Sequence, residues 1–242
     1  MKVFGFVRHN ERFFVHVTCN IILGITLLTV LAFSVFSPVA TQAYVSSTSA
    51  IYSGDRESSN VCLMINVYWG TEYLDDILNT LEKYNIKTTF FVGGCWTAKN
   101  NQMLQKIHSY GHEIGNHGYF HKDHTKLSSS QNQDEIYMTH ELVKALIGVE
   151  MDLFAPPSGS VNDKVVATAS KMSYRTIMWS RDTIDWRDKD KNVIFRRATE
   201  KTQGGDLILM HPTEQTVQAL EDIIVSLQNK GLKLTTVSQT IG

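Results

Sequence analysis

The sequence predicts an α/β protein built as an irregular (β/α) barrel, closed or incomplete, with about seven parallel strands. From Val61 onward, short apolar runs rich in β-branched and aromatic residues alternate with longer segments of helical period. The chain has 242 residues, 43% of them hydrophobic, which is enough for one buried core. Polar residues capable of chemistry follow the apolar runs. In a parallel barrel those carboxyl ends meet at one rim, where active sites form.

The first 43 residues are expected to be an export signal or a membrane anchor. Three basic residues, the last of them Arg12, precede an apolar run over 21–36, and small residues follow up to Ala43. The run of 16 residues is longer than many cleaved signals and shorter than a typical span, so cleavage and anchoring both stay open. Residues 44–60, rich in serine, are expected to be a linker. The expected location is therefore secreted, or anchored on the outer face of the cytoplasmic membrane.

The rest of the chain, residues 61–242, is expected to form one domain of alternating strands and helices. Each expected strand is a short apolar run; the runs cover 61–67, 88–92, 112–116, 152–155, 174–179, 206–210 and 232–237. Each expected helix has apolar residues three or four positions apart, and several end beside a glycine. These helices cover 73–85, 103–111, 131–147, 163–172, 193–202 and 217–230.

Two cysteines of the domain, Cys62 and Cys95, are expected to be free thiols. Cys62 opens the first strand, whereas Cys95 follows the far end of the second. If the two strands are parallel, the sulfurs lie at opposite ends of the sheet, beyond the ~7 Å Cα separation that a disulfide allows.

The charge pattern argues against a nucleic-acid partner. The formal net charge is −1, from 23 basic and 24 acidic residues. The sequence contains no basic block or stripe of the kind that follows a phosphate backbone. Nothing in the sequence indicates a protein partner.

A pair of histidines, His117 and His121, is the first candidate for chemistry. They lie four residues apart, and one helical turn between them would aim both imidazoles at one point. Neutral imidazole suits Zn²⁺ and similar divalent metals. Taken alone, such a pair is also typical of loop histidines that bond to the backbone, so the surrounding sequence has to decide.

The stretch from Gly111 to His121 resembles a strand and turn of the polysaccharide deacetylases, the NodB-homology family or carbohydrate esterase family four. The stretch 87–94 is similar to the second strand of that family, and the likeness covers about residues 60–237. The resemblance implies that His117 and His121 bind a divalent metal, zinc before others, which is held weakly or not at all if ligands are missing. It also implies metal-assisted N-deacetylation of a cell-wall amino-sugar polymer, peptidoglycan or chitin-like.

Two further motifs resemble the family near the C-terminus. The run 206–211 is similar to a motif whose histidine, here His211, is the general acid that protonates the leaving amine. The run 182–186 is similar to a motif whose aspartate, here Asp185, orients that histidine. Amide cleavage needs such an acid because an amine leaves poorly as an anion.

Three positions depart from the family pattern. Asn66 and Val67 stand where the family has two aspartates, one the general base and the other a third metal ligand, and Ala155 replaces an arginine. An amide such as Asn66 cannot accept a proton at neutral pH. The variant motif from Asn66 to Gly70 resembles a subgroup of deacetylase-like proteins linked to spore formation in Gram-positive bacteria.

Aromatic residues that follow the strands are candidates for binding sugar rings, which present apolar faces. Packing of the same residues into the barrel rim is the alternative. The turn 156–159 resembles one whose backbone N–H faces the developing oxyanion. The candidate substrate-binding residues are Tyr68, Trp69, Tyr119, Pro157, Ser158, Trp186 and Leu209, with Trp96 as a further aromatic candidate.

Three functions remain open at this level. The first is a deacetylase with activity reduced by the replaced residues, and the second is an inactive cell-wall glycan binder or scaffold. In the third, Asp123 or Asp185 takes over as base with a rearranged metal. The resemblance as a whole requires His117, His121 and His211 to share one pocket with Asn66 on its floor.

Overall fold

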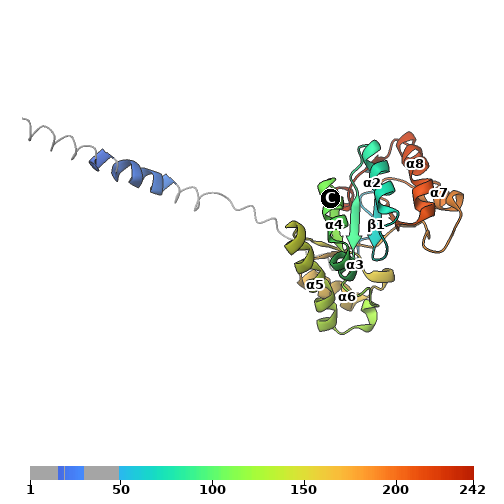
Figure 1. The fold of residues 1–242 in the computed structure, drawn as a ribbon, viewed down its shortest axis with the longest axis horizontal. Coiled ribbons are helices and arrows are strands. Elements are labelled where there is room, and N and C mark those ends of the chain that lie inside the picture. Colours follow the sequence, from blue (N-terminus) through green and yellow to red (C-terminus); the bar gives the residue numbers. More distant parts are fainter. Residues whose placement is uncertain (1–15, 19, 30–48) are drawn as a thin grey trace, which may run out of the picture. The chain divides into compact units, whose positions relative to one another are not determined.

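The computed structural model describes residues 16–18, 20–29 and 49–242, in two compact units, 1–45 and 46–242. In the first unit, residues 16–18 and 20–29 are helical and exposed (Figure 1). No helix among the described residues is long and apolar enough to cross a membrane. Arg12, Ala43 and much of the apolar run that suggest an export segment lie outside the described residues.

The second unit is organised around one sheet in which every strand pair is parallel. The strand order is β5-β4-β3-β2-β1-β7-β6, and β8 pairs with the start of β1. The bounds are β1 (Asn60–Val67), β2 (Thr89–Val92), β3 (Glu113–Asn116), β4 (Leu153–Phe154), β5 (Arg175–Thr176), β6 (Arg181–Asp182), β7 (Leu207–Met210) and β8 (Lys233–Leu234). Within the described chain no ladder joins β5 to β6, so the barrel is incomplete. This confirms the predicted α/β fold.

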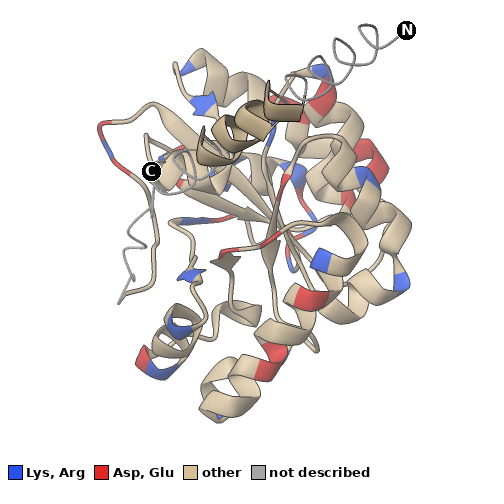
Figure 2. Cartoon of the chain, turned by 90° about the vertical axis from the view of Figure 1, so that its left-hand side faces the viewer, with Lys and Arg blue, Asp and Glu red and all other residues tan. Residues whose placement is uncertain are grey.

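The helices pack around this sheet (Figure 1). Their bounds are α2 (Leu74–Lys83), α3 (Gly94–Lys99), α4 (Asn101–Ser109), α5 (Ser129–Ile147), α6 (Asp163–Lys171), α7 (Lys191–Thr199), α8 (Glu214–Asn229) and α9 (Val237–Ile241). Basic and acidic residues are interspersed along the helices (Figure 2), and some pair, as Lys83 does with Glu221 at 2.7 Å.

Strand β1 is buried from Val61 to Val67 because it has sheet neighbours on both sides and side chains packed on both faces. Successive side chains alternate between two apolar clusters, as the pleat requires. Leu63 and Ile65 pack with the helices, whereas Cys62 and Met64 belong to a smaller inner cluster. The site at the carboxyl end of β1 therefore stands on a rigid strand.

Residues before β1 also pair with the domain. Ile51 bridges to Ile177, just after β5, and Ser53 bridges to Asp206, just before β7. Arg56 forms an ion pair with the buried carboxylate of Asp206. Part of the stretch 44–60 thus contacts residues on both halves of the sheet.

Cys62 and Cys95 are free thiols, as predicted. Cys62 is buried at the start of β1, beside Thr88 and Thr89, and burial raises the pKa of its thiol to about 12.

Candidate functional site

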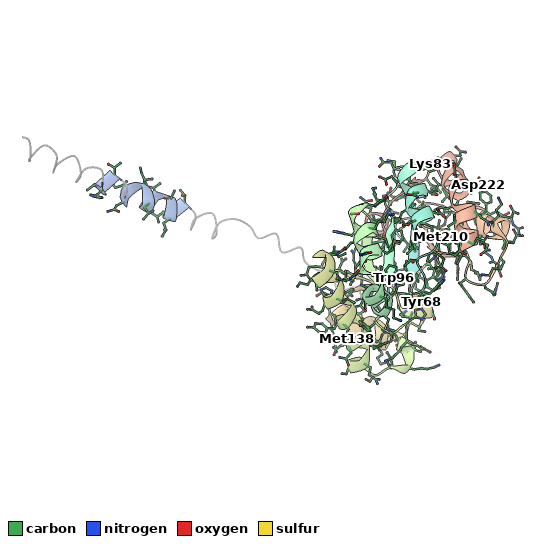
Figure 3. The ribbon with its side chains drawn as sticks, viewed as in Figure 1. Tyr68, Lys83, Trp96, Met138, Met210 and Asp222 are labelled. Carbon is green, nitrogen blue, oxygen red and sulfur yellow. The ribbon has the colours of Figure 1, made fainter. Side chains whose placement is uncertain are left out.

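The carboxyl ends of the strands surround a cavity of about 430 Å³. It contains Asn66 from the end of β1, His117 and His121 from the loop after β3, and His211 after β7. These are the side chains that the sequence predicts to meet. The full lining is Asn66, Tyr68, His117, His121, Ser158, Gly159, Trp179, Asp182, Trp186, Leu209 and His211. Figure 3 shows Tyr68 below Met210 and Trp96, with Lys83 near the top of the domain.

His117 is held by one hydrogen bond that determines its tautomer. Its Nδ1 lies 2.7 Å from the carbonyl oxygen of Ala155. A carbonyl only accepts, so Nδ1 carries the proton and Nε2 presents a lone pair. Nε2 is buried and has no hydrogen-bond partner among the described residues. Burial, reinforced by the neighbouring His121, holds the pKa of His117 well below its usual value.

His121 is positioned by a tight turn and covered by an aromatic ring. Its φ is +54°, and Gly118 earlier in the same loop has a φ of +69°, a left-handed conformation that glycine adopts without strain. The ring of Tyr68 stacks on His121 with centroids 3.6 Å apart and planes 19° apart. The rings of His121 and His117 lie 5.1 Å apart. Burial lowers the pKa of His121, so both imidazoles are neutral at physiological pH.

His211 and Asp185 form a buried pair. His211 Nδ1 lies 2.8 Å from one carboxylate oxygen of Asp185. The other oxygen accepts from the backbone N–H of His211 at 2.6 Å and from the hydroxyl of Thr216 at 2.6 Å. Trp69 stacks on the His211 ring at 5.3 Å. These contacts fix the orientation of the imidazole through Nδ1 and leave Nε2 outside the pairing with Asp185.

Asn66 lines the cavity at the carboxyl end of β1. Its side chain is 3% exposed, and its Oδ1 has no hydrogen-bond partner within the described part of the chain. The neighbouring Val67 is fully buried in the main apolar cluster. The end of β1 therefore supplies one neutral amide and no carboxylate.

The side chains that could hold a metal form an incomplete set. Catalytic zinc sites take three protein ligands and leave a fourth position for water or substrate. His117 and His121 could supply two, but Val67 supplies none, and the amide oxygen of Asn66 is a weak donor. No group of three His, Cys, Asp or Glu side chains suited to a metal occurs in the described residues. The residues present do not fit the catalytic metal that the family resemblance implies.

The predicted substrate-binding residues divide into two groups. Tyr68, Ser158, Trp186 and Leu209 line the cavity. Trp69 instead lines an adjacent hollow of about 410 Å³, which also contains Trp186.

Pro157, Tyr119 and Trp96 do not line the cavity. Pro157 is buried, and the Tyr119 ring packs against Gly94, where an added Cβ would lie 2.2 Å from it. Trp96 is also buried, and its indole N–H donates to the Gly70 carbonyl at 2.7 Å. The contacts of these three residues in the structure are therefore packing contacts within the domain.

Two cavity residues were not assigned roles from the sequence. Trp179 follows β5, and Asp182 belongs to the short strand β6. Asp182 accepts a hydrogen bond from the N–H of Ile184 at 2.8 Å, and burial raises the pKa of its carboxyl. The run 182–186, which resembles a family motif, contains Asp182, but only the three-dimensional structure shows that Asp182 lines the cavity.

The aspartates considered as alternative bases are both otherwise engaged. Asp123 accepts from the hydroxyl and N–H of Thr125 at 2.6 and 3.1 Å, which helps to lower its pKa to about 2. It does not line the cavity. Asp185 already holds His211 and Thr216. The geometry favours neither as a base.

Comparison with known sequences agrees with this site. Residues 53–177 match the family described as polysaccharide deacetylase. The chain is 41% identical over 189 residues to the uncharacterised protein YlxY of Bacillus subtilis (strain 168), covering 78% of this chain and 59% of YlxY. This chain thus spans little more than half of that relative. It is also 30% identical over 175 residues to a peptidoglycan-N-acetylglucosamine deacetylase of Bacillus cereus, covering 70% of this chain and 82% of the enzyme.

Comparison with solved structures adds a relative with a described loss of activity. Wild-type BA3943 of Bacillus anthracis, described as a CE4 family pseudoenzyme, superposes with a TM-score of 0.79 at 38% identity. The match covers 81% of this chain and 70% of that one. A mutant of BA3943 is described as having restored enzymatic activity. From the family match, the shared sequence and the shared fold, this chain belongs to the polysaccharide deacetylase family.

Proposed function

We propose that this protein binds an N-acetylated amino-sugar polymer of the cell wall, peptidoglycan or a chitin-like glycan, without hydrolysing its acetyl groups at a measurable rate. The observation that carries the proposal is the composition of the cavity. The acid pair of His211 and Asp185 is complete, whereas Asn66 stands in place of a base.

The cavity and its neighbour support glycan binding. A cavity of about 430 Å³ lies within the usual range for small-molecule sites. Tyr68 and Trp186 line it, and Trp186 extends into the adjacent hollow beside Trp69. Trp186 is 53% exposed, so its ring can contact the apolar face of a sugar. The Bacillus cereus relative is named for its action on peptidoglycan.

The absence of a general base at Asn66 supports the proposal that the protein does not hydrolyse the glycan at a measurable rate. A positioned general base contributes ~10²–10⁴-fold to rate, and an amide cannot take a proton from water at neutral pH. The metal chemistry of the family lacks a third ligand here. What remains to this chain is to bind the glycan and to orient it.

A deacetylase of reduced activity is the second candidate, favoured by one observation. The contacts of Asp185 with His211 and Thr216 are buried and intact. Cell-wall glycan lies outside the cytoplasmic membrane, so both candidates include secretion or an N-terminal anchor. The proposal includes a role in spore formation, which is supported by the resemblance of the motif from Asn66 to Gly70 to sporulation-linked proteins.

Binding and acetate release, measured on the same preparation of the full chain, test the proposal. We expect N-acetylglucosamine oligomers or peptidoglycan fragments to bind in calorimetry, with acetate release at background even after Zn²⁺ is added. Trp186→Ala should weaken binding, and Lys106→Ala, on the outer helix α4, should not. Absence of binding to every glycan would refute the proposal, and turnover that depends on stoichiometric metal would favour the second candidate.

A further inference from the structure

The cavity contains two buried hydrogen-bond acceptors that no side chain or backbone group of the described structure satisfies. One is Nε2 of His117, whose lone pair follows from the bond between Nδ1 and the Ala155 carbonyl. The other is Oδ1 of Asn66. Buried polar groups are normally paired, so these two atoms mark a place where a ligand with N–H or O–H donors is expected.

The charges around these acceptors favour a cation. Asp182 is the one carboxylate among the cavity residues, and the lining includes no lysine or arginine. The carboxylate of Asp185 lies directly behind His211. The cavity therefore offers acceptors and negative charge, with no fixed positive charge to oppose a cationic ligand.

A primary ammonium fits this set better than a divalent metal does. Zinc needs three protein ligands, whereas His117 and His121 supply two imidazoles beside the neutral amide of Asn66, and the third imidazole, His211, is paired with Asp185. An ammonium carries three N–H donors on one atom and needs only acceptors at hydrogen-bond distance. The ring of Tyr68, 5.6 Å from that of His117, adds an aromatic face of the kind that attracts cations.

An N-acetyl group fits the two acceptors less well. An acetamide has one N–H donor, and its carbonyl oxygen is itself an acceptor that would be repelled by Oδ1 of Asn66 or Nε2 of His117. A sugar that has lost its acetyl group presents an ammonium at the same carbon. The lone pairs of His117 Nε2 and Asn66 Oδ1 are therefore better suited to the ammonium that deacetylation produces than to the acetamide of the substrate.

We propose that the cavity recognises the primary ammonium of de-N-acetylated amino sugars in the cell-wall glycan, in preference to the N-acetylated sugar. The inference rests on the proposed function, that this cavity binds the glycan. On this inference another enzyme first removes acetyl groups from the glycan, and this protein then binds the partly deacetylated polymer.

Calorimetry on the full chain, freed of metal with a chelator, tests this with two tetramers of equal length. One is the tetramer of glucosamine and the other that of N-acetylglucosamine, at a pH where the amines are protonated. We expect the glucosamine tetramer to bind at least about tenfold more tightly, the worth of one charge-assisted hydrogen bond.

Substitutions at Asn66 connect the preference to the cavity. Asn66→Asp should raise the affinity for the glucosamine tetramer and leave that for the acetylated tetramer unchanged or lower. Asn66→Leu should reduce the preference. The matched control is Asn79→Asp, which makes the same change of charge at an exposed position on α2 and should alter neither affinity.

The outcomes separate this inference from the proposed function. If the acetylated tetramer binds as tightly as the glucosamine tetramer, or if glucosamine binds only when Zn²⁺ is added, the ammonium inference is wrong and glycan binding stands. An unchanged preference in Asn66→Asp would also overturn it. If neither tetramer binds, the proposed function fails as well.

Discussion

At the scale of single residues, the site is determined by which atoms have partners. Every oxygen of Asp185 is engaged, and this carboxylate serves to hold His211. In the same cavity, Nε2 of His117 and Oδ1 of Asn66 have no partner among the residues described. The polar atoms around His211 are therefore paired, whereas those of His117 and Asn66 present two acceptors without a partner.

Replacing Asp185 tests the organised half. Asp185→Asn keeps the shape but turns one acceptor oxygen into an N–H donor that opposes a donor of His211 or Thr216. We expect the free energy of unfolding to fall by about 1–3 kcal/mol, the cost of leaving a buried polar group unpaired. Urea denaturation measures it. A loss as small as that from Asp75→Asn, on the exposed end of α2, would contradict the buried pair.

A buried histidine outside the cavity, His112, gives a pH-dependent signal. Burial lowers its pKa from 6.5 to about 4, and its Nδ1 accepts from the N–H of Thr88 at 3.2 Å. The unfolded chain binds a proton more readily, so the contribution of His112 to stability is complete above pH 6.5 and is lost as the pH falls toward about 4. His112→Gln should flatten the fall in unfolding free energy across that range. An unchanged slope would show that other groups cause it.

At the scale of elements, the close packing of α3 can be tested at one glycine. A Cβ on Gly94 would lie 2.2 Å from the Tyr119 ring and 2.8 Å from the hydroxyl of Thr139 on α5. Gly94→Ala should lower the free energy of unfolding by about 1–3 kcal/mol, since an overpacked site must shift its neighbours. Gly93→Ala, whose Cβ would approach Tyr68 no closer than 3.2 Å, is the milder control in thermal unfolding. Equal effects would contradict the packing described for Tyr119.

Long elements with a clear period were predictable from sequence, and short ones were not. Strand β1 and helices α2 and α8 have enough buried apolar positions to reveal their period. Strand β6 has two residues and no apolar alternation, so only its pairing with β7 defines it. The expected strand over 232–237 gives way to helix α9, because Thr236 caps Gln239 and starts a new turn.

The same contrast holds within the candidate site. Motif residues such as His117 and His211 could be located because the strands that carry them end at one rim. The stacking of Tyr68 on His121, and the position of Asp182 in the cavity, depend on contacts between segments distant in sequence. The spacing of residues along the sequence does not predict those contacts.

At the scale of the whole domain, the segment before β1 ties the two halves of the open sheet together. Ile51 and Ser53 bridge to residues next to β5 and β7, and Arg56 pairs with buried Asp206. We expect Arg56→Ala to reduce the free energy of unfolding by about 1 kcal/mol, because Asp206 keeps its bond from Ser180 but loses a charged partner that is partly exposed. Chemical denaturation checks this, with Lys83→Ala as the surface ion-pair control. No loss beyond that control would mean that the segment adds no stability.

The central claim is that the cavity at the strand ends binds amino-sugar glycan without hydrolysing it. A crystal structure of the full chain with an amino-sugar tetramer tests it most directly. The account predicts an intact tetramer whose ring contacts Trp186 and whose C2 nitrogen lies within hydrogen-bond distance of His117 Nε2 or Asn66 Oδ1. A tetramer bound elsewhere, or a metal ion on His117 and His121 with released acetate beside it, would contradict the account.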